Sequence, residues 1–185
     1  SDAVAFHTGD PAKMVDIMWK LYDSIPEMGK QAEQYNQVPV FLQATETYHL
    51  ISAKKAVRSL DDIKGMKVGV FGGWIPKWVA AAGAVPVSVL AGEVFDALQR
   101  GTIEGRISAY ETAVRYGWVD VIKYTSLTDS GAVPGIMGTV NKKVWDSLHP
   151  AAQKIMLQVG REMGPKTAEF YKEEGEGYIK TFRDK

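Results

Sequence analysis

The stretch from residue 68 to residue 92 constrains the fold most, because it is strongly apolar and yet repeatedly interrupted by Gly and Pro. Lys77 is its only charged residue. A run of this length is long enough to cross a membrane as a helix, but the interruptions divide it into short pieces. Residues 67–71 and 85–89 have the character of buried strands, and residues 74–82 that of a helix. We therefore predict a buried β-α-β unit rather than a membrane span.

Outside this unit, strand-like and helix-like segments follow one another along the chain. Periodic apolar positions predict helices at residues 10–22, 24–35, 59–64 and 93–100, at 110–124 with a break near Gly117, and from residue 150 past residue 170. Short apolar runs predict strands at residues 38–42, 49–52, 103–109 and 136–141. Ser24 and Glu27 have capping-box spacing, so we expect Ser24 to open the second helix. This order of elements is typical of the α/β class.

Composition excludes several kinds of partner and chemistry. The 185 residues include 22 basic and 22 acidic side chains, so the formal net charge is zero. A neutral chain lacks the broad basic surface that nucleic acids require, and we expect no nucleic-acid partner. There are no cysteines, which excludes disulfides, thiolate metal sites and cysteine nucleophiles. The length suits one large domain or two small ones.

Few residues are arranged for catalysis or for cofactor binding. The three histidines, His7, His49 and His149, lie far apart and form no metal-binding motif. Gly69 lies in the predicted strand 67–71 and Gly72 and Gly73 follow it, but the spacing of the three is not that of a dinucleotide-binding loop. We therefore expect no metal, no cofactor and no enzymatic activity. One enzymatic alternative stays open, in which His49 and Glu111 act as an acid-base pair.

Four segments carry a resemblance to a known family. They are SLDDIKGMKV at residues 59–68, GEVFDALQRGTIEG at 92–105, VIKY at 121–124 and VNKKVWDSL at 140–148. In this order and spacing they resemble the DctP family. Its members are the extracytoplasmic receptors of tripartite ATP-independent periplasmic (TRAP) transporters. The resemblance extends from about residue 11 to the end of the chain.

The resemblance implies a two-lobed, type II-like periplasmic solute-binding fold. Family members begin with a β-α-β segment that would precede Ser1, so we expect a truncated chain that lacks it. By this comparison residues 1–46 are the remnant of lobe I and residues 47–134 form lobe II. Residues 135–174 return to lobe I, and residues 175–185 form a tail helix that runs back toward lobe II.

The resemblance also implies that the protein binds and hands over a solute without changing it chemically. The receptor would bind a small organic molecule, an organic acid or an aromatic compound, between its lobes in the periplasm. It would then deliver this solute to the membrane subunits of the transporter. A chain that lacks part of a lobe is also expected to self-associate. A second alternative to the receptor, besides the enzyme with the His49 and Glu111 pair, is the effector-binding domain of a transcription regulator. Such a domain would also bind its ligand between two lobes.

One departure from the family pattern affects the expected site. The family's arginine, which pairs with a ligand carboxylate in two-pronged fashion, corresponds here to Gly69, and Ser108 stands nearest to a frequent asparagine. Either Arg106 supplies the missing charge from a neighbouring strand, or Gly69 makes room for a bulkier ligand stacked on aromatic side chains. The expected ligand contacts are Tyr48, Phe71, Trp74, Arg106, Ser108 and Tyr110.

Overall fold

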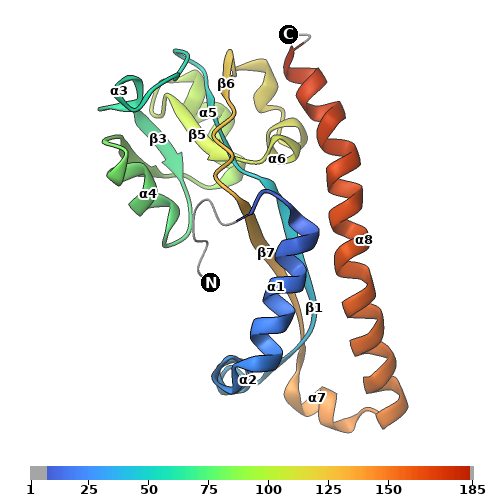
Figure 1. Cartoon of the computed structure of the whole chain (residues 1–185). Helices are drawn as coiled ribbons and strands as arrows, with labels where there is room; N and C mark the ends of the chain where they lie inside the picture. The colour runs from blue at the N-terminus through green and yellow to red at the C-terminus, as the bar shows by residue number, and fades with distance from the viewer. Residues whose placement is uncertain (1–7, 184–185) are drawn as a thin grey trace.

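The chain folds into two sheets joined by crossing strands, with one long helix beside both (Figure 1). The computed structural model describes residues 8–183, without the side chains of residues 133–135, 176 and 183. Strands β1 (Gln37–Thr47) and β7 (Ala132–Asn141) form a two-stranded antiparallel sheet. The other five strands form the second sheet. Chain segments between β1 and β2 and between β6 and β7 connect the two sheets.

The smaller sheet is packed against helix α1 (Pro11–Ser24), which is followed by α2 (Pro26–Gln34). Asp10 opens α1 as predicted, since its carboxylate accepts hydrogen bonds from the amides of Ala12 and Lys13. The predicted capping box at Ser24 is wrong. Ser24 is the last residue of α1, and Ile25 precedes α2 with no side-chain cap. Pro26 begins α2, a position that suits proline because the first amide of a helix has no partner within the helix.

The larger sheet has the strand order β4-β3-β5-β2-β6. The strands are β2 (His49–Ser52), β3 (Lys67–Val70), β4 (Val85–Ser88), β5 (Gly105–Ser108) and β6 (Tyr124–Ser126). β3 is parallel to both β4 and β5, whereas β2 is antiparallel to β5 and to β6. Helix α4 (Ile75–Ala81) connects β3 to β4. The predicted β-α-β unit is therefore confirmed.

Helices cover both faces of the larger sheet. Leu50 and Ile107 pack on one face with α3 (Leu60–Ile63) and α4. Ile51 and its neighbours pack on the other face with helices α5 and α6. The remaining elements of this half are η1 (Ala91–Glu93), α5 (Val94–Gln99), α6 (Tyr110–Arg115) and η2 (Trp118–Asp120). Because successive strand residues point to opposite faces, Leu50 and Ile51 belong to different cores.

The helix predicted over residues 110–124 is only partly correct: the expected break near Gly117 is present, but the chain does not return to an α-helix after it. α6 ends at Arg115, and Gly117 then adopts a left-handed conformation with a φ of 69°. This conformation suits glycine and stops the helix. Tyr124 belongs to β6 rather than to a helix, and β6 pairs with β2. The strand forms because β2 offers it an open edge, which is a contact between distant parts of the chain.

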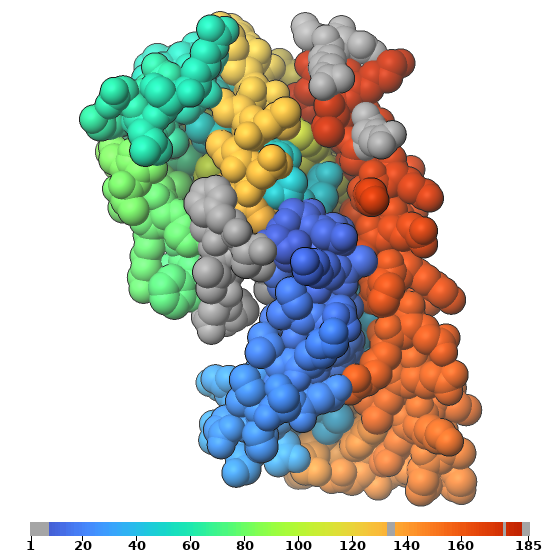
Figure 2. Space-filling model, in the orientation of Figure 1, coloured from blue at the N-terminus to red at the C-terminus, as the bar shows by residue number. Residues whose placement is uncertain are grey.

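Helix α8 (Pro150–Arg183) runs along both sheets and follows the short helix α7 (Lys142–Ser147). It packs closely on β1, since a Cβ at Gly160 would overlap the carbonyl oxygen of Val40. Figure 2 shows α1, in blue, seated against the orange part of α8. The last turns of α8 reach the larger sheet, where Tyr178, Ile179 and Phe182 pack against its second core.

Between residues 8 and 183, no helix has both the length and the apolar character that a membrane crossing requires.

Candidate functional site

Arg106 lies at the centre of the larger sheet, on β5. Its register partners are Gly69 on β3 and Ile51 on β2. Gly69 has no side chain of its own, and a Cβ there would lie 2.8 Å from Ile103 Cδ1 and 3.6 Å from Arg106 Nη1. The space above Gly69 is therefore occupied by Ile103 and Arg106. This arrangement favours the first of the two sequence-based alternatives, a charge supplied by Arg106, over a vacancy for a bulky ligand.

The Arg106 guanidinium is buried, with only 3% of the residue exposed. Its Nη1 donates a hydrogen bond of 3.0 Å to the carbonyl oxygen of Val89, while its buried Nε has no partner in the described residues. The guanidinium carbon lies 5.3 Å from the centre of the Phe71 ring and 5.2 Å from that of Trp118. Burial lowers the pKa of Arg106 to about 10, so the group is still a cation at neutral pH.

Tyr48 and Phe71 extend this group toward the surface. Their ring centres lie 5.9 Å apart. Tyr48 is buried at the junction of β1 and β2, and burial raises the pKa of its hydroxyl. Phe71 follows β3 and is 36% exposed. We call Tyr48, Phe71, Arg106 and Trp118 the arginine cluster. It combines one buried cation with aromatic rings, a combination that suits a carboxylate attached to a small organic body.

The other predicted contacts have different surroundings. Ser108 is buried opposite His49 in the β2–β5 register. Tyr110 is also buried, between the His49 ring at 4.8 Å and the Phe182 ring at 4.9 Å. Trp74 is exposed at the start of α4, where the Lys77 ammonium lies 4.1 Å from its ring centre. Tyr48, Phe71 and Arg106 thus form one connected group, while Tyr110 packs the end of α8 onto the sheet.

Trp118 joins the cluster although it is not among the expected ligand contacts. It is fully buried. Its contact with Arg106 has no local signal, because the two residues are on different elements and meet only in the folded chain.

The acid-base alternative finds no support in the geometry. In the part of the chain that the structure describes, no hydrogen bond or ion pair joins His49 to Glu111. The Glu111 carboxylate binds Arg115 at 2.8 Å and Thr112 Oγ1 at 3.2 Å. His49 Nδ1 accepts a hydrogen bond of 3.4 Å from the Asp129 amide. Residues 8–183 also contain no group of three or more His, Asp or Glu side chains arranged to hold a metal ion.

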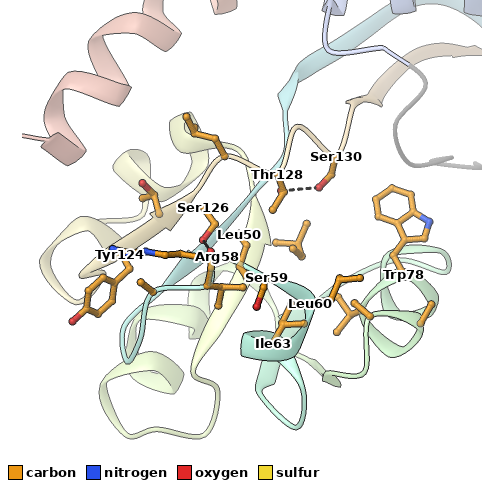
Figure 3. A pocket seen from close by; sticks show the side chains of 18 of the residues that line it. Leu50, Arg58, Ser59, Leu60, Ile63, Trp78, Tyr124, Ser126, Thr128 and Ser130 are labelled. Atoms are coloured by element: carbon orange, nitrogen blue, oxygen red, sulfur yellow. Dashed lines mark hydrogen bonds between the residues drawn. The ribbon is translucent and has the colours of Figure 1, made fainter.

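A groove of about 950 Å³ lies on the opposite face of the same sheet (Figure 3). It runs between α3, α4 and β6, and its floor includes Leu50 and Ile107. A hydrogen bond of 2.9 Å between the hydroxyls of Thr128 and Ser130 lies at its edge. None of the six predicted ligand contacts lines this groove. Leu50 and Ile107 point away from the arginine cluster because they alternate with Ile51 and Arg106 along their strands.

The two joined sheets and the long helix define a class of protein, because the same arrangement is found in solved TRAP periplasmic solute-binding proteins. A Bordetella pertussis extracytoplasmic solute receptor binding pyroglutamic acid is 21% identical with a TM-score of 0.85, over 99% of this chain and 59% of that chain. A Sulfitobacter protein with bound β-D-galacturonate is 22% identical with a TM-score of 0.82, over 98% of this chain and 60% of that chain. At these identities the likeness establishes the fold.

The chain belongs to family 7 of the bacterial extracellular solute-binding proteins, DctP, which matches residues 20–185. The family resemblance predicted from the four segments is therefore confirmed. An uncharacterized protein of Haemophilus influenzae is 27% identical over 157 residues, which are 84% of this chain and 45% of the relative. A solute-binding protein of Verminephrobacter eiseniae is 29% identical over 117 residues, or 62% of this chain and 34% of the relative. The chain thus spans less than half the length of these relatives.

Proposed function

We propose that this chain forms the arginine-bearing part of a periplasmic receptor, which binds a small organic acid between two lobes and delivers it to the membrane subunits of a TRAP transporter. The observation that carries the proposal is the buried Arg106 guanidinium, whose Nε has no partner in the described residues. A buried donor without a partner is costly. A ligand carboxylate supplies the acceptor that this donor lacks.

The chemistry of the similar proteins supports this class of ligand. Galacturonate and pyroglutamic acid, bound by the Sulfitobacter and Bordetella proteins, are both carboxylic acids. A guanidinium can bind a carboxylate through two parallel hydrogen bonds. In the described residues, Arg106 Nη1 donates to the Val89 carbonyl oxygen, while Nε has no hydrogen-bond partner. In our proposal the carboxylate binds Arg106, and Phe71 and Trp74 contact the body of the ligand.

The division into lobes is part of the same proposal. Lobe I comprises residues 1–46 and 135–174, lobe II comprises residues 47–134, and the tail 175–185 returns to lobe II. Residues 1–7 and 184–185 lie outside the described residues. Two observations support the division: each lobe has its own sheet, and the end of α8 packs on the core of the larger one. A ligand that contacts both lobes favours their closed arrangement, because only that arrangement offers all contacts.

Binding of acids is measurable on this chain by following amide NMR shifts during titration with D-glucuronate, D-galacturonate and pyroglutamate. We expect one of these acids to shift the amides of β3 and β5, and an Arg106→Met variant to bind it at least tenfold more weakly. Arg106→Lys should restore only part of the affinity, because lysine cannot make the two-pronged contact. Arg100→Met, a change on the exposed end of α5, is the matched control. Equal affinity of Arg106→Met and the parent contradicts the proposed site.

We also propose that the isolated chain self-associates through the first half of α8. Large apolar side chains are exposed there at helical spacing, namely Ile155, Met156, Val159 and Met163. Light scattering after gel filtration should give a mass above 20.4 kDa. An Ile155→Glu, Val159→Glu double variant should return the mass to that of a monomer, and a monomeric parent contradicts the proposal.

A further inference from the structure

Glu46, near the end of β1, contacts the helix that follows β5. Its Oε1 accepts a hydrogen bond of 2.6 Å from the backbone amide of Glu111, in the first turn of α6. β1 belongs to the smaller sheet, whereas α6 directly follows the central strand of the larger one. The hydrogen bond therefore joins the two sheets next to Tyr48, where the chain crosses between them.

Helix α8 meets the same carboxylate at Gly175. A Cβ at this position would lie 3.1 Å from Glu46 Oε2, which is closer than most Cβ atoms approach a neighbour. Gly175 is buried, and α6 and α8 contact one another. The Glu46 carboxylate thus lies where β1, α6 and α8 meet. Because residue 175 is glycine, α8 can pack against the Glu46 carboxylate without displacing that carboxylate.

The groups around Glu46 are acidic or neutral. Glu111 faces it from α6, with its own carboxylate bound to Arg115, and Tyr178 lies near it on α8, with Glu174 beside Tyr178. In the described residues no cation forms an ion pair with Glu46. Burial raises the pKa of Glu46, and the charge of Glu111 raises it further, while the amide hydrogen bonds act in the opposite direction.

We propose that Glu46 is a positioning residue: its carboxylate holds the start of α6, and with it Ser108 and Tyr110, in place relative to the strand that crosses between the sheets. Tyr110 begins α6 and Ser108 ends β5, so both move with the segment that Glu46 holds. The consequence for ligand binding rests on the receptor function proposed above. The structural part of the proposal does not depend on any ligand.

The first test is a pH titration of the ligand-free chain by amide NMR. The Glu111 amide should shift with a midpoint above the ordinary glutamate value of about 4.3, because it reports protonation of its acceptor. Glu46→Gln keeps a neutral acceptor of the same shape, so it should abolish this titration and leave the chain folded. Glu27→Gln, an exposed change in α2, should leave the titration of the Glu111 amide unchanged. An unchanged Glu111 titration in Glu46→Gln overturns the proposal.

A second pair of variants tests the same contact from α8. Gly175→Ala should displace the Glu111 amide resonance, because the added methyl group presses on Glu46. Gly177→Ala should not, since nothing lies within 4 Å of a Cβ there. Equal effects of the two variants contradict the proposed contact.

Affinity for D-glucuronate and pyroglutamate separates this proposal from the receptor function. Glu46→Ala should weaken binding of the preferred acid about tenfold, because Ser108 and Tyr110, two of the expected ligand contacts, are then no longer held in place, and Glu46→Gln should weaken it less. Wild-type affinity in Glu46→Ala overturns the consequence for binding. If the parent binds neither acid, the receptor function fails, while loss of the Glu111 titration in Glu46→Gln still supports the positioning role.

Discussion

Gly69 and Arg106 are register partners on adjacent parallel strands, and Arg106 Nη1 lies 3.6 Å from the point where a Cβ of residue 69 would be. The glycine on β3 and the arginine on β5 are therefore complementary. One strand leaves the space that the side chain of the other fills. A positive charge expected from β3 by resemblance to the family is present at the same face of the sheet, but it comes from β5.

This complementarity predicts the effect of a single methyl group at position 69. Gly69→Ala should destabilise the chain by about 1–3 kcal/mol, because the added Cβ meets Ile103 Cδ1 at 2.8 Å. The free energy of unfolding in urea measures the effect. Gly92→Ala is the control, since a Cβ there has no neighbour within 4 Å. Two variants of equal stability would show that the space above Gly69 is open.

Replacement by alanine should change the stability of the chain in opposite directions at two glycines of α8. Gly160 packs on β1, where a Cβ would overlap the Val40 carbonyl oxygen, so Gly160→Ala should destabilise the chain by about 2 kcal/mol or more. Gly177 has no neighbour within 4 Å of its Cβ position, so Gly177→Ala should stabilise it by up to about 1 kcal/mol through helix propensity. Thermal unfolding of both variants checks this, and a stabilised Gly160→Ala contradicts the close packing of α8 on β1.

The ion pair between Asp23 and Arg161 should add a small stability that disappears in acid. Its two hydrogen bonds measure 2.8 and 2.7 Å and join α1 to α8. They lower the pKa of Asp23. The stability is therefore present above the ordinary aspartate pKa and is lost as pH falls through the lowered folded value.

Since both side chains are about half exposed, a double-mutant cycle with Asp23→Asn and Arg161→Gln should give about 0.5–1 kcal/mol at pH 7. The coupling should vanish near pH 2. The exposed pair of Asp16 and Lys20 within α1 is the comparison and should couple less strongly. A coupling that persists in acid would exclude the carboxylate as its source.

His49 should make the chain less stable below neutral pH. Burial lowers the pKa of its imidazole, and nearby Asp129 only partly opposes this shift. The unfolded chain, with an ordinary histidine pKa of about 6.5, then binds a proton before the folded chain does. The free energy of unfolding therefore falls as pH drops below about 6.5.

His49→Phe, which retains a ring to stack on Tyr110, should reduce this fall between pH 7 and pH 5 by about 1 kcal/mol. Asp129→Asn should make the fall steeper, because it removes the charge that favours the protonated ring. Denaturant unfolding at a series of pH values measures both effects. Identical pH profiles for His49→Phe and the parent would assign the dependence to other groups.

The local elements and the family could be predicted from the sequence, whereas the surroundings of the site could not. Asp10 opens α1, Gly65 and Gly101 end short helices with positive φ, and the β-α-β unit lies where its apolar pattern predicts. Caps, turns and periodic burial depend on residues within a few positions of each other, so the sequence displays them directly.

Strand pairing and burial depend on residues far apart in the chain, so they become apparent only once the chain is folded. Tyr124 is in a strand because β2 offers it an edge, against a helical local pattern. The sequence identified Arg106 as a candidate cation, but its burial between Phe71 and Trp118 arises from contacts among three separate elements. The class of protein and the order of its elements thus follow from local patterns and motifs of the chain. The fold decided which side chains meet, because their contact energies exist only once distant strands are paired.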